Sequence, residues 1–316
     1  MSRAAIRKRV KSGIPGLDET LGGGIPDGSR LLLAGGAGCG KTIFSAQYVY
    51  NGVKLFREPA VYVCTEEPPQ EFIQNLLPFG WNLERLERRK KLYIVDAVYT
   101  RMQSDKGLQE ILYNLRTKLS EVKLLVEEMR AKRLVIDSLP GFGFRVTETE
   151  TLREIFLEVG LLLKDVGCTT IMTTEIVEGS QLISRYGIEE FLATGVIVLR
   201  HERNPFGHTV RKLWIKKMRG TAHSLAEHTF IIGSRGISIG GGMARDLTSL
   251  TQTHNSVLSP DQDPPKQSPL ARPRDVENIS FSKTRPNNPD PRQKQLTTGE
   301  TRLMQGSQRK IRLGLL

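Results

Sequence analysis

The sequence predicts an α/β protein: a mostly parallel sheet with helices on both faces, extended by antiparallel strands. Short apolar runs typical of buried strands alternate along the chain with longer segments of helical periodicity. A glycine-rich loop joins the first of these strands to the first long helix, and later strands end in acidic or polar residues. Because ligands of open α/β sheets bind at the carboxyl ends of the strands, the same features predict a nucleotide site.

The glycine-rich loop is the most specific motif of the chain. It follows an apolar strand at Leu31 to Ala34 and precedes a segment of helical spacing at Ile43 to Tyr50. Its eight residues fit the phosphate-loop pattern G-x-x-x-x-G-K-[ST]: Gly35, Gly36, Ala37, Gly38, Cys39, Gly40, Lys41 and Thr42. We expect the backbone N–H groups to bind phosphate, Lys41 to reach the β- and γ-phosphates, and the Thr42 hydroxyl to hold Mg²⁺.

Two acidic residues follow the next strand, Ala60 to Thr65. Glu66 and Glu67 stand at the strand end where nucleotides bind, and a carboxylate there can orient and deprotonate the attacking water. The alternative is that both residues only begin the next helix, from about Pro69, where acidic side chains are favoured. The spacing leaves both interpretations open.

A third acid ends the apolar strand Arg133 to Asp137, which follows a strand candidate at Leu92 to Val95 and a long helical pattern at Leu108 to Met129. An apolar strand ending in Asp, placed after a phosphate loop, is the Walker B pattern. Asp137 is therefore expected to hold Mg²⁺ directly or through water. Ser138 either forms a hydrogen bond near the γ-phosphate or caps the strand end.

The segment from 150 to 240 has one more helix and then several strands. The helix is expected at Glu150 to Val166, and the strands are expected at Gly167 to Glu175, Gly195 to Leu199, Val210 to Met218 and His228 to Ile239. The last two strands form the antiparallel extension. Lys217 and Arg219 lie two residues apart and therefore on one face of a strand. Without further information, such a basic pair is typical of a solvated stripe.

Composition limits the classes of partner. The 316 residues carry a net charge of +12, but the basic residues are dispersed, so nucleic acid is a partner that the composition allows and does not favour. From Asp246 to Leu316, Phe281 is the one aromatic residue amid Pro, Gln, Asn and Ser, and this tail is expected to be disordered. Cys39, Cys64 and Cys168 have neither disulfide nor metal spacing. No apolar run approaches the roughly 20 residues that span a bilayer, so a cytoplasmic protein without a membrane contact is expected.

Three stretches resemble the KaiC branch of the RecA-like ATPases. G-I-P-G-L-D and L-G-G-G-I-P lie within Ser12 to Ser29, Y-G-I-E-E-F spans Tyr186 to Phe191, and K-M-R-G-T-A-H spans Lys217 to His223. The resemblance covers about Ser12 to Gly242 and one ATPase domain. It implies a RecA-like P-loop domain at 1–245, followed by the tail at 246–316.

The same resemblance implies a function. It predicts that the chain binds ATP and Mg²⁺ and hydrolyses ATP slowly in a ring, most simply a homohexamer, as a regulatory or signalling ATPase read by a protein partner. It assigns Glu66 as the residue that activates water. It also places Lys217 and Arg219 against the γ-phosphate held by the adjacent subunit, and an arginine supplied in this way is worth about 10³ to 10⁵ in rate.

Two departures from the family pattern bear on the reaction. Thr194 stands where many members have Asp before the next strand, which leaves that contact open. Glu190 and Phe191 stand where the self-phosphorylating domain has Ser and Thr, so self-phosphorylation is not expected there, because phosphoryl transfer needs a hydroxyl. A RecA-type DNA-binding recombination or repair accessory and a protein kinase-like activity are the alternative functions.

Overall fold

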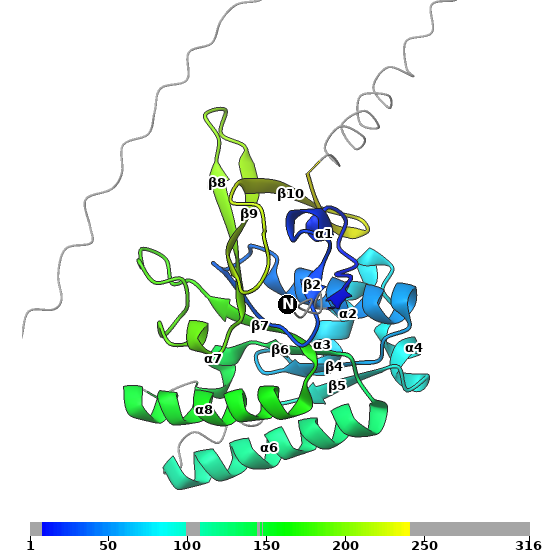
Figure 1. Ribbon diagram of the computed structural model, residues 1–316, viewed down its shortest axis with the longest axis vertical. Helices are drawn as coiled ribbons and strands as arrows, with labels where there is room; N and C mark the ends of the chain where they lie inside the picture. Colours follow the sequence, from blue (N-terminus) through cyan, green and yellow to red (C-terminus); the bar gives the residue numbers. More distant parts are fainter. Residues whose placement is uncertain (1–7, 99–107, 144–145, 147, 241–316) are drawn as a thin grey trace, which may run out of the picture. The chain divides into compact units, whose positions relative to one another are not determined.

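The computed structural model describes residues 8–98, 108–143, 146 and 148–240. Within them, a nine-stranded sheet has the order β11-β10-β9-β8-β3-β7-β6-β4-β5 (Figure 1). Six neighbouring strands are parallel: β3 (Arg30–Gly35), β4 (Ala60–Cys64), β5 (Leu92–Asp96), β6 (Arg133–Asp137), β7 (Thr169–Glu175) and β8 (Gly195–Arg203). The predicted mostly parallel α/β sheet is confirmed. The tail expected at 246–316 lies outside the described residues, and the boundary at 245 stays a prediction.

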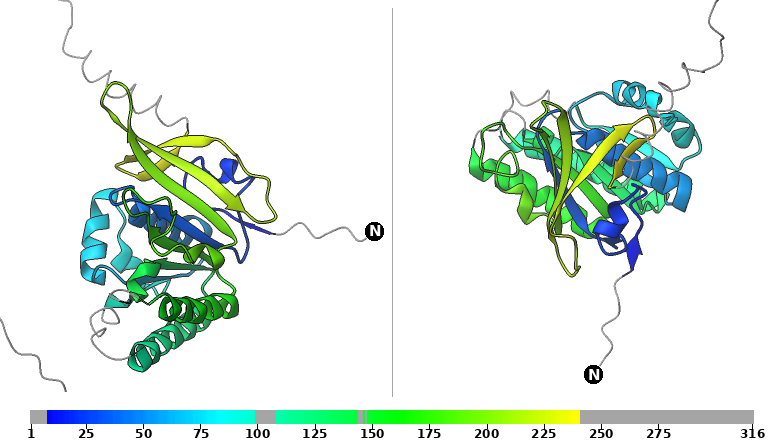
Figure 2. Two further views of the ribbon diagram at one scale, coloured as in Figure 1. Left: turned by 90° about the vertical axis from the view of Figure 1, so that its left-hand side faces the viewer. Right: turned by 90° about the horizontal axis from the view of Figure 1, so that it is seen from above.

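Helices cover both faces of the parallel strands (Figure 1, Figure 2). One face packs against α2 (Lys41–Phe56), α3 (Pro69–Leu76) and α4 (Leu83–Arg88), and the other packs against α6 (Leu108–Met129), α7 (Leu139–Phe142) and α8 (Thr149–Val166). Successive side chains of β3 alternate between the two cores, with Leu31 and Leu33 in the first and Leu32 and Ala34 in the second. Because both faces are covered, the strand is a continuous apolar run rather than an alternating one.

The antiparallel extension is confirmed, with one correction. β9 (Thr209–Met218) pairs with β8, as predicted. The single strand expected at His228 to Ile239 is instead a hairpin of β10 (Glu227–Gly233) and β11 (Gly236–Ile239). Gly233 and Gly236 pair across a two-residue turn, and Gly236 has a φ of 98°, a conformation that a residue without Cβ adopts without strain. The four residues Gly233, Ser234, Arg235 and Gly236 are the local signal of this turn, between two apolar segments.

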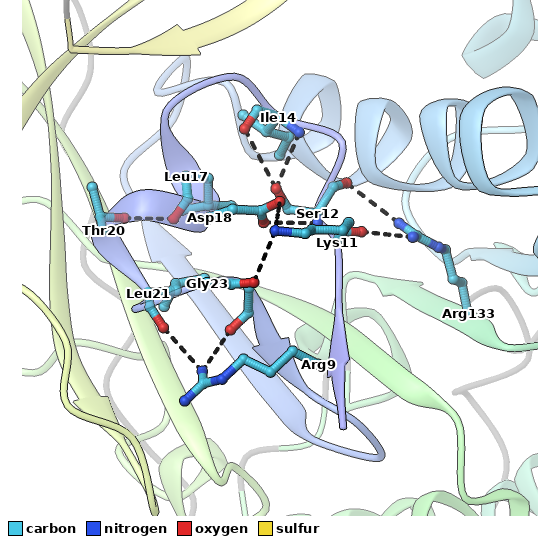
Figure 3. Close-up of polar contacts among 11 residues, drawn as sticks. Arg9, Lys11, Ser12, Ile14, Leu17, Asp18, Thr20, Leu21, Gly23 and Arg133 are labelled. Atoms are coloured by element: carbon cyan, nitrogen blue, oxygen red, sulfur yellow. Dashed lines mark hydrogen bonds and ion pairs between the residues drawn. The ribbon is translucent and has the colours of Figure 1, made fainter. Parts of the chain in front are cut away.

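The segment before β3 folds back on the sheet. It contains a short helix, α1 (Leu17–Thr20), and two residues each of β1 (Arg9–Val10) and β2 (Ile25–Pro26), which pair with each other. Figure 3 shows its polar contacts. The Arg9 guanidinium donates to the carbonyl oxygens of Leu21 and Gly24 at 3.0 and 2.8 Å. These bonds fix the loop between α1 and β2, which delivers the chain to β3. Within the described ranges, no helix has the length and apolar character needed to cross a membrane.

Candidate nucleotide-binding site

The phosphate loop lies between the end of β3 and the start of α2. Gly38 and Gly40 have φ values of 71° and 99°, in the left-handed region that glycine adopts freely, and this lets the loop curl around an anion. The Lys41 ammonium donates to the carbonyl oxygens of Gly35 and Gly36 at 2.9 and 3.0 Å. An ammonium has three donors, so one remains for a phosphate oxygen.

Most of the predicted site residues line one cavity of about 560 Å³. The predicted residues in its wall come from the phosphate loop, from the end of β4 and from the end of β6: Ala37, Gly38, Gly40, Lys41, Thr42, Glu66, Asp137 and Ser138. The ends of β4 and β6 and the loop that follows β3 therefore meet at one sheet edge, as the parallel topology requires.

Three residues of the predicted phosphate loop lie elsewhere. Gly35 ends β3, and Gly36 and Cys39 line a separate cavity of about 320 Å³ on another side of the loop. The Cys39 side chain is buried, with its Sγ 3.3 Å from Nδ1 of His201, and burial raises the pKa of its thiol. Cys64 and Cys168 are likewise buried, and none of the three cysteines forms a disulfide. These three side chains fill space in the core.

The residues predicted to hold Mg²⁺ suit that ion. Thr42 and Asp137 line the 560 Å³ cavity and also a second cavity of about 300 Å³ next to it. Both offer oxygen, the ligand atom that Mg²⁺ prefers, and Mg²⁺ keeps several waters and phosphate oxygens rather than an all-protein shell. Among the described residues there is no group of three or more His, Cys, Asp or Glu side chains placed to hold a metal. The predicted pair thus offers one carboxylate, from Asp137, and one hydroxyl, from Thr42, beside the phosphate loop.

The two glutamates after β4 differ in their surroundings. Glu66 lines both cavities and accepts a short hydrogen bond from the Ser138 hydroxyl. Glu67 lines only the second cavity and accepts from the Asn75 amide at 3.0 Å. Partial burial raises the pKa of Glu67. Glu66 is therefore the carboxylate that faces the phosphate loop, whereas Glu67 faces α3. The helix itself begins at Pro69, two residues later.

Lys217 and Arg219 lie at the opposite edge of the sheet. β9 ends at Met218, so Arg219 is one residue beyond the strand and not on it as expected. The Lys217 ammonium donates to the carbonyl oxygen of Ala193 at 3.0 Å, and burial and the nearby Arg219 lower its pKa. Arg219 is exposed, and its N–H donates to the carbonyl oxygen of Thr194.

The contacts of Thr194 show that this edge lies at the start of β3. Its hydroxyl accepts from the N–H of Arg30 at 2.9 Å, and Arg30 is the first residue of β3. The phosphate loop begins five residues later, at the other end of β3, and five residues of strand span about 17 Å. The basic pair thus lies too far from the phosphate loop of its own chain to contact a phosphate there.

Sequence reasoning missed two residues whose polar atoms lack a partner. Arg211, near the start of β9, lines the 560 Å³ cavity, and its buried Nε has no hydrogen-bond partner. Thr221, two residues after Arg219, has a buried hydroxyl oxygen without a partner. Buried polar atoms are normally bonded, so both atoms indicate a ligand or a neighbouring chain. Thr221 lies inside the K-x-R-G-T-x-H stretch, so the family resemblance could have identified it. No local motif identifies Arg211.

An aromatic cavity of about 640 Å³ lies beside α2 and the β10–β11 hairpin. Trp81 stacks between Tyr50 and Phe79, with ring centroids 5.7 and 5.0 Å away. Gly233 of β10 lines this cavity, and its neighbour Ile232 lines the phosphate cavity, so the two hollows flank one strand. Aromatic walls with a few polar groups are typical of sites that bind flat rings.

Comparisons with known proteins agree with this geometry. Residues 10–243 match the model of the KaiC ATPase family. The circadian clock oscillator protein KaiC of Synechococcus elongatus is 37% identical over 237 residues, which are 73% of this chain and 44% of that protein. KaiC of Thermostichus vulcanus is 36% identical over 238 residues, with the same shares of 73% and 44%. The chain spans about half the length of the curated relatives it matches.

A solved structure also matches. The crystal structure of a KaiC-like protein from the hyperthermophilic archaeon Pyrococcus horikoshii OT3 has a TM-score of 0.66 and 40% sequence identity to this chain. The match covers 74% of this chain and 99% of the archaeal one. Sequence and backbone therefore point to the same RecA-like P-loop architecture.

Proposed function

The chain belongs to the KaiC family of ATPases, and from this premise we propose that it binds Mg-ATP and hydrolyses it slowly in a ring of identical subunits, most simply a hexamer. The observation that carries the proposal is the meeting of Lys41, Thr42, Glu66 and Asp137 in one cavity at the carboxyl edge of the sheet. The output of such a ring is regulatory: a protein partner reads the state of the nucleotide.

Each residue has a role in the proposed hydrolysis. The loop N–H groups and Lys41 bind the β- and γ-phosphates, and Thr42 and Asp137 hold Mg²⁺ directly or through water. The metal, when bound, supplies positive charge against the phosphate oxygens. Glu66 orients a water and accepts its proton as the water oxygen attacks the γ-phosphorus, and the bond to the bridging oxygen breaks to leave ADP and phosphate. Ser138 holds Glu66 through their hydrogen bond.

The basic pair acts from the neighbouring subunit in this proposal. Lys217 and Arg219 lie at the edge opposite their own phosphate loop, so they reach a γ-phosphate only if that edge rests against another chain. The edges are also complementary in charge, since the phosphate cavity carries the carboxylates of Glu66, Asp137 and Glu175. A head-to-tail contact of this kind closes into a ring when the rotation between subunits permits.

The aromatic cavity is the proposed place of the base. With the phosphates at the loop, the base of the same nucleotide lies across β10, where the rings of Phe79 and Tyr50, stacked on the buried Trp81, provide flat surfaces. Stacking on such rings is favourable for any base. The preference for adenine over guanine rests on the family.

Mixed oligomers test the intersubunit site directly. Glu66→Gln removes the base of a subunit's own site, and Arg219→Ala removes the group given to the neighbour, so each variant alone should be inactive. When the two are mixed, about one quarter of the interfaces join an intact Glu66 to an intact Arg219, and activity should return in that proportion. Lys216→Ala, at an exposed residue beside the pair, is the control. A mixture without activity, or Arg219→Ala protein that hydrolyses ATP as a monomer at the wild-type rate, would contradict the proposal.

A further inference from the structure

Tyr62 carries a hydroxyl into the centre of the site from the middle of β4. Its side chain is 1% exposed, and its hydroxyl oxygen lies 2.7 Å from Oδ2 of Asp137 and 3.0 Å from Oγ of Ser45. Ser45 lies in the first turns of α2, and its Oγ is also 3.1 Å from the carbonyl oxygens of Lys41 and Thr42. One tyrosine therefore connects the end of β6 to the start of the helix that follows the phosphate loop.

The carboxylate of Asp137 sets the direction of its hydrogen bond with Tyr62. A carboxylate only accepts hydrogen bonds, so the Tyr62 hydroxyl donates to Oδ2. The Tyr62 oxygen is then one of three acceptors within reach of the Ser45 hydroxyl, beside the carbonyl oxygens of Lys41 and Thr42. Burial, and next to it the charge of Asp137, raises the pKa of Tyr62 well above its ordinary value.

The second oxygen of Asp137 is held in the same way. The Thr173 hydroxyl of β7 donates to Oδ1 of Asp137 in a short hydrogen bond. A carboxylate has about four acceptor positions on its two oxygens. Two neighbouring strands thus occupy one position on each oxygen of Asp137. The remaining positions are left for the cavity that Asp137 shares with Thr42.

We propose that Tyr62 is a positioning residue for the Mg²⁺ site: its hydroxyl orients the Asp137 carboxylate relative to Thr42 and so sets the affinity of the nucleotide complex for the divalent cation. This inference rests on the proposed function. Tyr62 acts through Asp137 and touches no reacting atom. The partners that orient a metal-binding carboxylate commonly change metal affinity by 10-fold or more when they are removed.

Packing alone does not account for the hydroxyl. The Tyr62 ring stacks on Phe72 with centroids 4.3 Å apart, and a phenylalanine would keep that contact. A buried hydroxyl costs free energy unless it is bonded, so its presence at this position requires the bonds to Asp137 and Ser45. Tyr62→Phe therefore removes the proposed function of the residue and leaves its place in the core.

Metal binding of the full chain tests this proposal, with Tyr48→Phe as the matched control. Tyr48 is equally buried, and its hydroxyl donates to the carbonyl oxygen of Thr169 at 3.0 Å, away from Asp137. We would measure Mn²⁺ binding to the ADP complex by electron paramagnetic resonance, ADP binding in EDTA by calorimetry, and the thermal midpoint of each variant. Tyr62→Phe should weaken Mn²⁺ binding on the order of 10-fold, with ADP binding in EDTA unchanged. Tyr48→Phe should change neither.

The Asp137→Asn background adds a second criterion. If Tyr62 acts through the carboxylate, Tyr62→Phe should weaken Mn²⁺ binding no further in that background. Equal Mn²⁺ affinities for Tyr62→Phe and Tyr48→Phe, or full additivity with Asp137→Asn, would overturn the role of Tyr62 and leave the proposed function standing. Wild-type protein that binds neither ADP nor Mn-ADP would overturn both.

Discussion

The Arg133 guanidinium binds the Glu58 carboxylate through two nitrogens, with Nε and Nη2 at 2.8 and 2.7 Å from the same oxygen, although Arg133 is fully buried. Its other donors go to the carbonyl oxygens of Tyr48, Lys11 and Ser12 at 2.8, 2.6 and 3.3 Å. One side chain at the start of β6 thus joins the amino-terminal segment to the phosphate-loop helix. Figure 3 shows its bonds to Lys11 and Ser12.

Arg133→Met should destabilise the fold by about 3 kcal/mol, because three buried carbonyl groups and a partly buried carboxylate lose their donor. The methionine fills the space of the aliphatic part of Arg133 but loses the guanidinium that lies 4.3 Å above the Tyr48 ring centroid. Urea denaturation monitored by circular dichroism measures the loss. Glu58→Gln, which leaves the carbonyl bonds intact, should cost less, and equal losses for the two variants would contradict this assignment.

Gly52→Ala should destabilise the protein even though alanine is the better helix former by about 1 kcal/mol. A Cβ at Gly52 would lie 2.3 Å from Nε and 2.4 Å from Cδ of Arg133, so the arginine would have to leave its pocket. We expect a net loss of about 2 kcal/mol in the free energy of unfolding. In an Arg133→Ala background the same change should become neutral or stabilising, which a double-mutant cycle in urea would detect.

Glu66→Gln should reduce kcat for ATP hydrolysis by about 10² to 10⁴ while ADP still binds, because the general base is removed and the phosphate loop is intact. Glu67→Gln is the paired control, since Glu67 bonds to Asn75 and does not line the cavity of the phosphate loop that holds Lys41. Steady-state rates and calorimetric ADP affinities of both variants test which carboxylate is the general base. A larger loss of rate in Glu67→Gln would reverse the roles proposed for the two carboxylates.

Arg211→Ala should weaken ATP binding by about 10-fold or more, since its buried and unpartnered Nε lies in the wall of the phosphate cavity. Lys212→Ala serves as the control, because Lys212 pairs with Glu202 and Glu227 and lies on the other face of β9. Binding of a fluorescent ATP analogue measures both. Equal affinities would mean that Arg211 serves the fold alone.

The features that sequence predicted well are those carried by neighbouring residues. The phosphate loop, the strand ending in Asp137 and the acids after β4 are local patterns, and the structure brings Lys41, Glu66 and Asp137 together as parallel topology requires. Spacing alone did not decide which of Glu66 and Glu67 activates water, because both follow the same strand end. Only their surroundings distinguish them.

The features that sequence missed depend on pairing between distant segments. Tyr62 and Asp137 are 75 residues apart and meet because β4 pairs with β6 in a register that aligns Cys64 with Asp137. In the sequence, Tyr62 is one more residue of a β-branched and aromatic strand. The hairpin at Gly233 to Gly236 was missed although its signal is local, since Gly-Ser-Arg-Gly separates the two apolar segments that form its strands.

β9 carries a basic side chain with a proposed role in phosphate binding near each of its ends, Arg211 and Lys217. Arg211 lines the phosphate cavity of its own chain, and Lys217, six residues on, lies at the opposite edge of the sheet. In the proposed ring, every such strand would touch two nucleotides at once, one in its own subunit and one in the next. A movement of one subunit against the next would change the distance from Lys217 to the neighbouring phosphates while Arg211 stays beside its own. Hydrolysis at one site would therefore depend on the position of the adjacent subunit.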